Sequence, residues 1–345
     1  MKTLLVQPST LHSFLTQVFK PHLLSSEAQT ALINHLVEAN LWGIDSHGVQ
    51  QIIGYDKSLK SGRINPKPEI KVISERPSLI RIDADAAPGQ YAAKVAMEMA
   101  IVKAGKTGIA VVGVTNSKHF GVAGYYTRMA TDAGMIGFAT TDTNVVDLAP
   151  FGGRIAKLGN NAISWGIPTG NQPVIIDMAT GAVSGGKVKH FAYQGLEIPL
   201  GWGLTAEGKP TLNPEEVAVN IPASYKGSGL AFISDLLCGP LLGTTTAMFK
   251  NKAIHNAENG TGHLFLVLDV AAWTDKETFY QEVQKTINSL KETPRLEAEE
   301  PIYYPGELEK ITREQRLQNG IPIPLSLIET LAAHFGGNII SEYLI

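Results

Sequence analysis

The chain has 345 residues, of which 44% are hydrophobic and 18% are charged, so it can bury a large core and form more than one domain. Its formal net charge is −3, and no run of Lys or Arg is present. A protein that binds nucleic acid or an anionic membrane usually carries an excess of basic residues, and this chain has none. We therefore expect a small-molecule partner.

The single cysteine, Cys238, excludes an internal disulfide framework and fits a reducing compartment. Polar residues interrupt the apolar run near the N-terminus before a signal-peptide core can form. No segment has the uninterrupted apolar length that spans a bilayer. We therefore expect a cytoplasmic protein.

Two helices are predicted at the start of the chain. Ser9 precedes a helical pattern that ends before Pro21, and its apolar positions fall on one face: Leu11, Phe14, Leu15, Val18 and Phe19. Ser26 and Gln29 match a capping box for a second helix. These helices lead to Ser46, His47 and Gly48.

A second domain is predicted to begin where the pattern changes. Residues 78–85 alternate with a period of two, which is typical of a strand, and residues 89–105 follow a helical pattern. Further strands are predicted at 108–114, 135–143, 173–180 and 262–270. Further helices are predicted at 122–134, 228–239, 277–291, 311–320 and 325–336. The fold class is α/β or α+β.

Familiar catalytic motifs are absent or lie in the wrong context. Gly201–Ala206 matches the dinucleotide fingerprint G-x-G-x-x-A, but turn residues surround it, whereas a true fingerprint follows a strand and opens a helix. Asp45, Ser46 and His47 are adjacent, so they cannot form a hydrolase triad. No Walker loop, H-E-x-x-H or CxxC pair occurs, and we predict no metal site.

Two histidines and one lysine remain as candidates. His119 lies in a predicted strand-to-helix loop, where α/β proteins often contact ligands, and His47 follows the N-terminal helices. The alternative is that both are satisfied structural histidines. Lys226 precedes an apolar helix expected to start near Gly229, where backbone N–H groups and the helix dipole suit an anion. The alternative there is a glycine-rich cap with a solvated lysine.

At these motifs the sequence resembles the type 2 malate/L-lactate dehydrogenase family. The order and spacing of the shared pieces match over nearly the whole chain. They are Ser46–Gly48, Asn116–Gly121, Ala149–Gly153, Asp177–Thr180 with Gly186 and Lys187, Ile198 and Pro199 with Gly201 and Trp202, Gly208–Thr211, Tyr225–Gly227 and Pro305–Glu307.

The resemblance implies a homodimer that uses NAD or NADP and does not have a Rossmann fold. It implies a cofactor-binding domain over 76–309, built on a mostly antiparallel mixed sheet, and a helical part from 1–75 with 310–345. It implies proton-transfer roles for His47 and His119. It also implies a set of cofactor-binding residues: Gly121, Val122, Ala123, Thr143, Ile175, Ile176, Asp177, Met178, Ala179, Tyr225, Lys226, Gly306, Glu307 and Leu308.

Three positions depart from the family pattern. Gln51 stands where many members have Arg, Asn160–Ala162 replaces the common T-N-P, and Thr205 replaces an Asp. Gln51 can hydrogen-bond an oxygen, but it lacks the charge and the bidentate fork of Arg. This change weakens any assignment of simple malate or lactate as the substrate.

The leading hypothesis is an oxidoreductase that interconverts a small 2-hydroxy acid and its 2-oxo acid. The cofactor carries the hydride, and a histidine with a near-neutral pKa transfers one proton. We favour His47 as the general acid, with Ser46 and Gln51 as substrate contacts. The alternatives are a cyclic imino acid reductase and a non-catalytic ligand-binding dimer.

Overall fold

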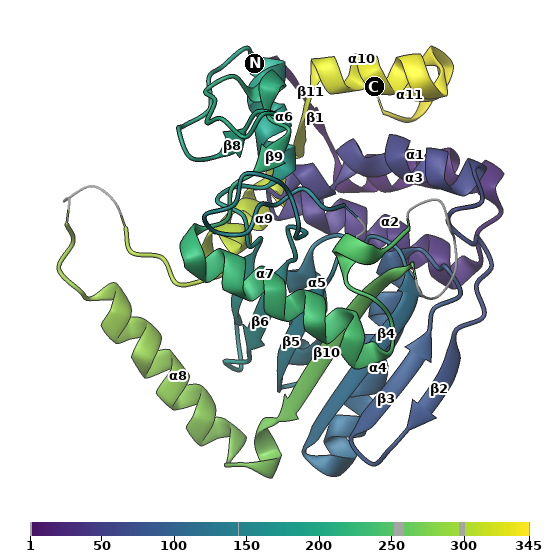
Figure 1. The fold of residues 1–345 in the computed structure, drawn as a ribbon. Coiled ribbons are helices and arrows are strands. Elements are labelled where there is room, and N and C mark those ends of the chain that lie inside the picture. Colours follow the sequence, from purple (N-terminus) through teal and green to yellow (C-terminus); the bar gives the residue numbers. More distant parts are fainter. Residues whose placement is uncertain (1, 144, 252–258, 297–300, 345) are drawn as a thin grey trace.

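The computed structural model describes residues 2–143, 145–251, 259–296 and 301–344 and is shown in Figure 1. A seven-stranded sheet occupies the centre, with the strand order β2-β3-β4-β10-β5-β6-β7. Its strands are β2 (Lys71–Glu75), β3 (Leu79–Asp83), β4 (Ile109–Ser117), β5 (Met135–Thr141), β6 (Ile163–Ile167), β7 (Val174–Met178) and β10 (Thr261–Asp269).

The pairing confirms the predicted mostly antiparallel mixed sheet. Within the described ranges, β3 and β4 pair in parallel, and the other neighbouring strands of this sheet pair antiparallel. In β3, Ile80 and Ile82 are buried, as the period-two alternation predicts. The central strands β4 and β10 bury aliphatic side chains, among them Val112, Val114 and Val267.

Helices cover both faces of the sheet. Helices α4 (Gly89–Thr107) and α5 (Ala123–Asp132) pack on one face, and α7 (Ser224–Cys238) crosses the other face at the front of Figure 1. The buried side of α4 is built from small residues, which let the helix approach the strands closely: Ala92, Ala93, Ala96, Ala100 and Ala104. Helix α8 (Lys276–Lys291) extends away from the sheet.

Both ends of the chain build a separate helical layer. It contains α1 (Pro8–Phe19), α2 (Ser26–Leu41), α3 (Ile52–Lys60), α10 (Leu325–Phe335) and α11 (Gly337–Tyr343), with its own hydrophobic core. Strand β1 (Thr3–Val6) pairs antiparallel with β11 (Ile321–Pro324), which joins the two chain ends. Helix α9 (Glu307–Asn319) connects this layer to the sheet region.

The domain boundary at residue 75 stays a prediction. Strand β2 lies on the N-terminal side of that boundary, yet it pairs with β3 as the edge strand of the large sheet. We therefore propose that the helical part ends ahead of Lys71. None of the helices in the described part of the chain is long and apolar enough to cross a membrane.

Two predicted helix starts were wrong. Ser25, not Ser26, caps α2, because its hydroxyl accepts a hydrogen bond from the Ala28 amide. Helix α7 begins at Ser224, so Lys226 lies inside its first turn rather than ahead of it. The rejected fingerprint match at Gly201–Ala206 overlaps β8 (Gly203–Leu204), which pairs with β9 (Val219–Asn220) and opens no helix.

A buried carboxylate joins three parts of the helical layer. Asp56 of α3 accepts hydrogen bonds from His22 at 2.9 Å and from His334 of α10 at 2.8 Å, and it pairs with Lys60 at 3.0 Å. Burial opposes ionisation of Asp56, but the hydrogen bonds from His334, Lys60 and His22 outweigh it and lower the pKa.

Asp56→Asn should therefore lower the free energy of unfolding by about 3 kcal/mol, because two histidines lose a charged partner. The depressed pKa means that this contribution is present above the unfolded-state pKa of Asp and is lost as the pH falls through the folded-state pKa. Urea unfolding at a series of pH values measures both effects. The control, Lys60→Ala, removes the exposed partner and should cost less than about 1 kcal/mol. Equal losses in the two variants would contradict a role for the buried histidine contacts.

Candidate active site

A cavity of about 820 Å³ lies between the helical layer and the ends of strands β5, β6 and β7. The turn before α3 contributes Ser46, His47 and Gln51 to its wall, and the β4–α5 loop contributes His119. Helix α6 (Gly185–Gln194) adds its N-terminal residues to the lining, and Gly186 lies directly against Ser46. The cavity therefore brings together all four residues predicted to handle substrate.

The two histidine rings lie next to each other in the wall of this cavity. Their centroids lie 5.5 Å apart, and the ring planes are inclined by 29°. The Nδ1 atom of each ring contacts a protein hydroxyl, Ser46 Oγ for His47 at 3.0 Å and Tyr55 Oη for His119 at 2.7 Å. Neither Nε2 atom has a hydrogen-bond partner among the described residues. Both Nε2 atoms are thus available to a ligand.

The turn that carries His47 is fixed from α2 and α9. Asn40 donates to Asp45 at 2.7 Å and accepts from the Val49 amide at 2.8 Å. Arg316 binds both carboxylate oxygens of Asp45. A Cβ on Gly48 would lie 2.2 Å from Asn40 Oδ1, so glycine is required for this bracing. This is why His47 stands between a hydroxyl and a glycine.

A hydrogen-bonded chain sets the tautomer of His119. Gln90 donates from Nε2 to the Tyr55 hydroxyl at 2.7 Å. The hydroxyl in turn donates a hydrogen bond to His119 Nδ1, since no other acceptor is within reach among the described residues. A neutral His119 therefore carries its proton on Nε2, where it can donate a hydrogen bond to a ligand oxygen.

Both histidines favour the neutral form. Removal from bulk water lowers the pKa of His47. Desolvation and the proximity of His47 also lower the pKa of His119. Two imidazolium rings at this distance would repel each other, so the pair holds at most one extra proton.

The loop after His119 is shaped by a buried histidine of α2. Nε2 of His35 accepts a hydrogen bond from the Val122 amide at 2.8 Å. Gly121 has a φ of +82°, and a Cβ there would lie 2.0 Å from His35 Nε2. Asp177 of β7 accepts a hydrogen bond from the Gly124 amide at 2.6 Å. These contacts give the loop a backbone surface that faces the cavity.

The predicted cofactor residues fall into three groups. One group lines the large cavity: Gly121, Val122, Ala123, Thr143, Asp177 and Ala179. Ile175 and Gly306 line a small adjoining cavity that also contains Asp177. The others line neither cavity: Ile176, Met178, Tyr225, Lys226, Glu307 and Leu308. Successive side chains of β7 point to opposite faces of the sheet. Ile175 and Asp177 therefore lie on one face, and Ile176 and Met178 lie on the other.

Several residues of the site were missed in the sequence. Tyr55 lies one turn after Gln51 on α3, a spacing that could have placed it on the same face. Gln90, inside an alanine-rich helix, gave no signal. Ser184 at the start of α6 was missed, because α6 itself was not predicted.

These residues fit a nicotinamide dinucleotide. The cavity has the volume of a cofactor site, and Gly121 leaves room for close approach to the loop backbone. Helix α6 opens with Ser184, Gly185 and Gly186, so its first amide groups can bind a phosphate. When bound, such a cofactor would supply or accept the hydride.

Comparisons with known proteins identify the family. The malate/L-lactate dehydrogenase family model matches residues 6–332. A malate dehydrogenase of Pyrococcus horikoshii is 35% identical over 337 residues, covering 94% of this chain and 93% of its own. Its solved structure gives a TM-score of 0.88 at 32% identity, covering 99% and 96% of the two chains.

Two other relatives differ in the chemistry that their names state. An L-sulfolactate dehydrogenase of Methanocaldococcus jannaschii is 32% identical and covers 95% of each chain. The structure of a delta1-piperideine-2-carboxylate reductase from Pseudomonas syringae gives a TM-score of 0.83 at 26% identity, covering 96% of this chain and 100% of its own. The histidine pair and its cavity thus lie in an oxidoreductase, and the chain belongs to the malate/L-lactate dehydrogenase family.

Proposed function

We propose that the protein interconverts a 2-hydroxy acid and its 2-oxo acid with NAD or NADP, and that the two histidines act on one substrate oxygen. The observation that carries this proposal is the pair of free Nε2 atoms facing the cavity. His47 takes the proton of the 2-hydroxyl at Nε2 in oxidation and returns it in reduction. His119 donates a hydrogen bond from Nε2 to the same oxygen and orients it.

The Ser46 hydroxyl supports this division of roles. It can accept from His47 Nδ1, which leaves the Nε2 lone pair of neutral His47 free to act as a base. Gln51 is engaged with the Ser46 carbonyl oxygen at 2.6 Å and braces the turn. The protein thus supplies one proton acceptor and one fixed donor.

A substrate panel tests the proposed reaction. Oxidation of NADH and of NADPH should be followed at 340 nm with several 2-oxo acids. Turnover of at least one 2-oxo acid supports the proposal, and the preferred nucleotide identifies the cofactor. Binding of either nucleotide, followed by its fluorescence, without any turnover would favour a non-catalytic ligand-binding dimer.

Reduction of a cyclic imino acid is the second candidate. The structural likeness to a delta1-piperideine-2-carboxylate reductase favours it. An iminium carries its own positive charge and therefore needs less proton donation. Cyclic imines belong in the same panel, and activity on them without activity on 2-oxo acids would replace the first candidate.

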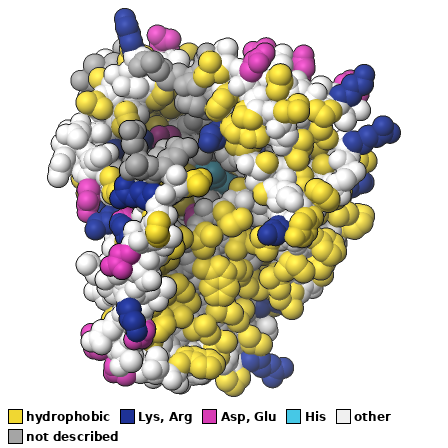
Figure 2. All heavy atoms as spheres, turned by 90° about the vertical axis from the view of Figure 1, so that its left-hand side faces the viewer, with side chains coloured by type: hydrophobic (Ala, Val, Ile, Leu, Met, Phe, Trp, Pro, Cys, Tyr) yellow, Lys and Arg dark blue, Asp and Glu magenta, His cyan; other side chains and the backbone are white. Residues whose placement is uncertain are grey.

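A homodimer is part of the proposal, and an exposed apolar face supports it. Figure 2 shows hydrophobic side chains gathered over much of one side of the molecule. Exposed large hydrophobic residues lie on α7 and just beyond it: Leu230, Phe232, Ile233, Leu241 and Phe249. Light scattering should give the mass of two chains, since a surface of this kind is rarely left in water. A stable, active monomer would contradict this assignment.

We also propose a cytoplasmic location, which the free, buried Cys238 supports.

Lys226→Ala should raise the KM for the cofactor more than it lowers kcat. Lys226 is exposed in the first turn of α7, and this turn is pressed against the segment after β7, where a Cβ on Gly227 would meet Thr180 O at 2.2 Å. A cation there can contact a cofactor phosphate or ribose. Steady-state kinetics with varied cofactor measures the effect, with Lys209→Ala as the control. An unchanged cofactor KM would remove Lys226 from the site.

A further inference from the structure

A buried histidine of β10 contacts the β4–α5 loop on both sides of His119. The side chain of His263 is fully buried and does not line the cavity. Its Nε2 atom lies 2.8 Å from Ser117 Oγ, at the end of β4. Its ring stacks on the ring of Phe120, with centroids 4.7 Å apart and planes inclined by 9°. His263 therefore contacts the chain shortly before His119 and directly after it.

The other ring nitrogen joins this contact to the centre of the sheet. His263 Nδ1 lies 2.8 Å from Thr141 Oγ1 on the neighbouring strand β5. Thr141 Oγ1 is nearer to Asp142 O, at 2.6 Å, so its hydroxyl donates there and accepts from His263 Nδ1–H. The Ser117 hydroxyl is nearer to His263 Nε2 than to its other acceptor, a backbone carbonyl at 3.4 Å. Burial lowers the pKa of His263, so a neutral ring donates to Thr141 and accepts from Ser117.

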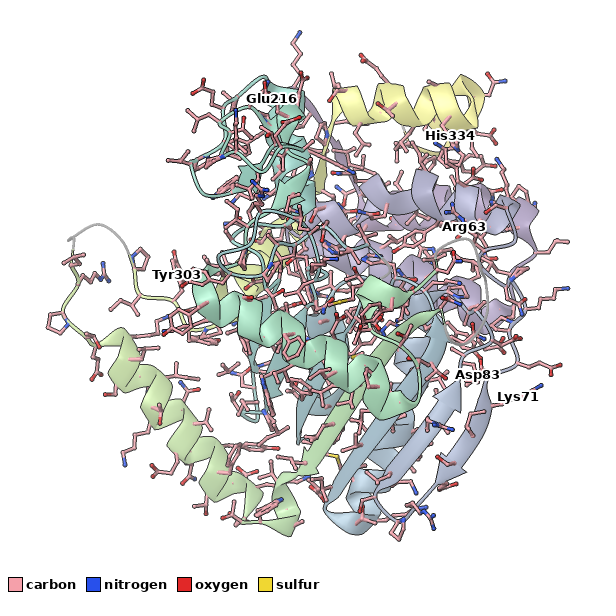
Figure 3. All side chains as sticks on the ribbon, viewed as in Figure 1. Arg63, Lys71, Asp83, Glu216, Tyr303 and His334 are labelled. Carbon is pink, nitrogen blue, oxygen red and sulfur yellow. The ribbon has the colours of Figure 1, made fainter. Side chains whose placement is uncertain are left out.

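The backbone bends sharply just before Ser117. Asn116 has a φ of +56°, in the left-handed region that residues other than glycine rarely adopt. Asp83, the last residue of β3 (Figure 3), accepts a hydrogen bond from Asn116 Nδ2 at 2.8 Å. The pairing of β4 with β10 is also irregular here, with a register shift between Thr261 and His263. A strained turn of this kind persists only where the surrounding contacts hold it, and the bond from Ser117 to His263 is one of them.

Two buried histidines thus hold the loop from opposite ends. His35 of α2 accepts a hydrogen bond from the Val122 amide at 2.8 Å, after His119. His263 of β10 accepts from the Ser117 hydroxyl, before His119. Only a short segment lies between the two contacts, so its backbone has little freedom while both are made.

We propose that His263 is a positioning residue that holds the Ser117 end of the loop, so that Nε2 of His119 points into the cavity. It acts through His119 and does not touch the substrate. This inference rests on the proposed function for the role of His119. Holding the loop matters because a small misplacement of a group that contacts the reacting atoms lowers the rate steeply.

Two amide side chains separate the two bonds of His263. Asparagine can keep a donor near the position of Nδ1, toward Thr141, but it is too short to reach Ser117. Glutamine is longer, and its Oε1 can accept from the Ser117 hydroxyl. His263→Asn should therefore loosen the loop, and His263→Gln should retain it. Ser117→Ala removes the same bond from the other partner, and it keeps the test valid if His263→Asn does not fold.

Hydrogen exchange of the full chain, followed by mass spectrometry, tests the inference without turnover. In His263→Asn and in Ser117→Ala, peptides that contain the Val122 amide should exchange about tenfold faster, because a local segment has lost one buried hydrogen bond. In His263→Gln the rate should stay within about twofold of the unmodified chain. The control, Val267→Ala, truncates a fully buried side chain farther along β10. It should lower the melting temperature without changing exchange in the loop.

Steady-state kinetics with the preferred 2-oxo acid provide the second measurement. His263→Asn should lower kcat/KM about tenfold, with the same division between kcat and KM as His119→Ala. In the His119→Ala background, His263→Asn should have no further effect, because His263 acts only through His119. Val267→Ala should leave kcat and KM unchanged.

The outcomes separate this inference from the proposed reaction. Unchanged loop exchange in His263→Asn and Ser117→Ala overturns the inference, and so does equally fast exchange in His263→Asn and His263→Gln. An additive loss in the double variant, or a loosened loop with an unchanged kcat/KM, also overturns it. If the loop loosens as expected but the unmodified chain turns over no 2-oxo acid and no cyclic imine, the proposed reaction fails and the contact between His263 and the loop stands.

Discussion

Replacing His47 by alanine should lower kcat for the preferred 2-oxo acid by about 10²–10⁴-fold, while NADH binding persists. The reason is that His47 presents a free Nε2 to the cavity and is held through a turn braced by Asn40 and Arg316. His119→Ala should cost less in kcat or should act mainly on the substrate KM, because His119 donates a fixed hydrogen bond.

Tyr55→Phe is the matched control for this division of roles. It removes the hydroxyl that binds His119 Nδ1 at 2.7 Å but leaves both imidazoles in place. We expect an effect similar to that of His119→Ala and much smaller than that of His47→Ala. If neither histidine variant lowers kcat/KM by about tenfold with cofactor affinity intact, both histidines are structural and the mechanism is wrong.

Lys250→Met should lower the free energy of unfolding by about 3–5 kcal/mol. Lys250 forms a buried ion pair with Asp142 and donates to Gly260 O at 2.7 Å. Asp142 also accepts from the Gly262 amide at 2.9 Å, so it joins the end of β5 to β10. Without the lysine, a carboxylate stays buried without its counter-ion. Burial already raises the pKa of Asp142 to about 6.

The double variant Asp142→Asn/Lys250→Met separates the charge from the contact. It should recover part of the stability lost in Lys250→Met, because no unpaired charge is left inside. Urea unfolding of the single and double variants provides the cycle. A loss below about 1 kcal/mol in Lys250→Met would show that the pair is not a structural link.

Elements with strong periodicity were predictable from the sequence. The apolar face of α1 is buried at the five predicted positions, and β3, β4, β5, β7 and β10 lie where strands were expected. Strand β2 was missed because its five residues are all exposed and carry no alternation. Strand β11 was missed because its two prolines resemble a loop, although its pairing with β1 satisfies the backbone.

The candidate site was predictable only as a set of residues. The motifs located His47 and His119, and they could not give the 5.5 Å between the rings, which depends on how α3 packs against the β4–α5 loop. The role of Gly121 depends on His35, which is far away in the sequence and which no motif links to this loop.

The pairing of β1 with β11 has a consequence for the order in which the protein is made. During translation, β1 leaves the ribosome among the first residues, but its partner strand follows only after every strand of the central sheet has been synthesised. The sheet can therefore form on the nascent chain while β1 is still unpaired. Arg316, which binds Asp45 in the turn that carries His47, is also synthesised after the whole central sheet. The nascent protein should thus acquire its central sheet before the turn that carries His47 is braced.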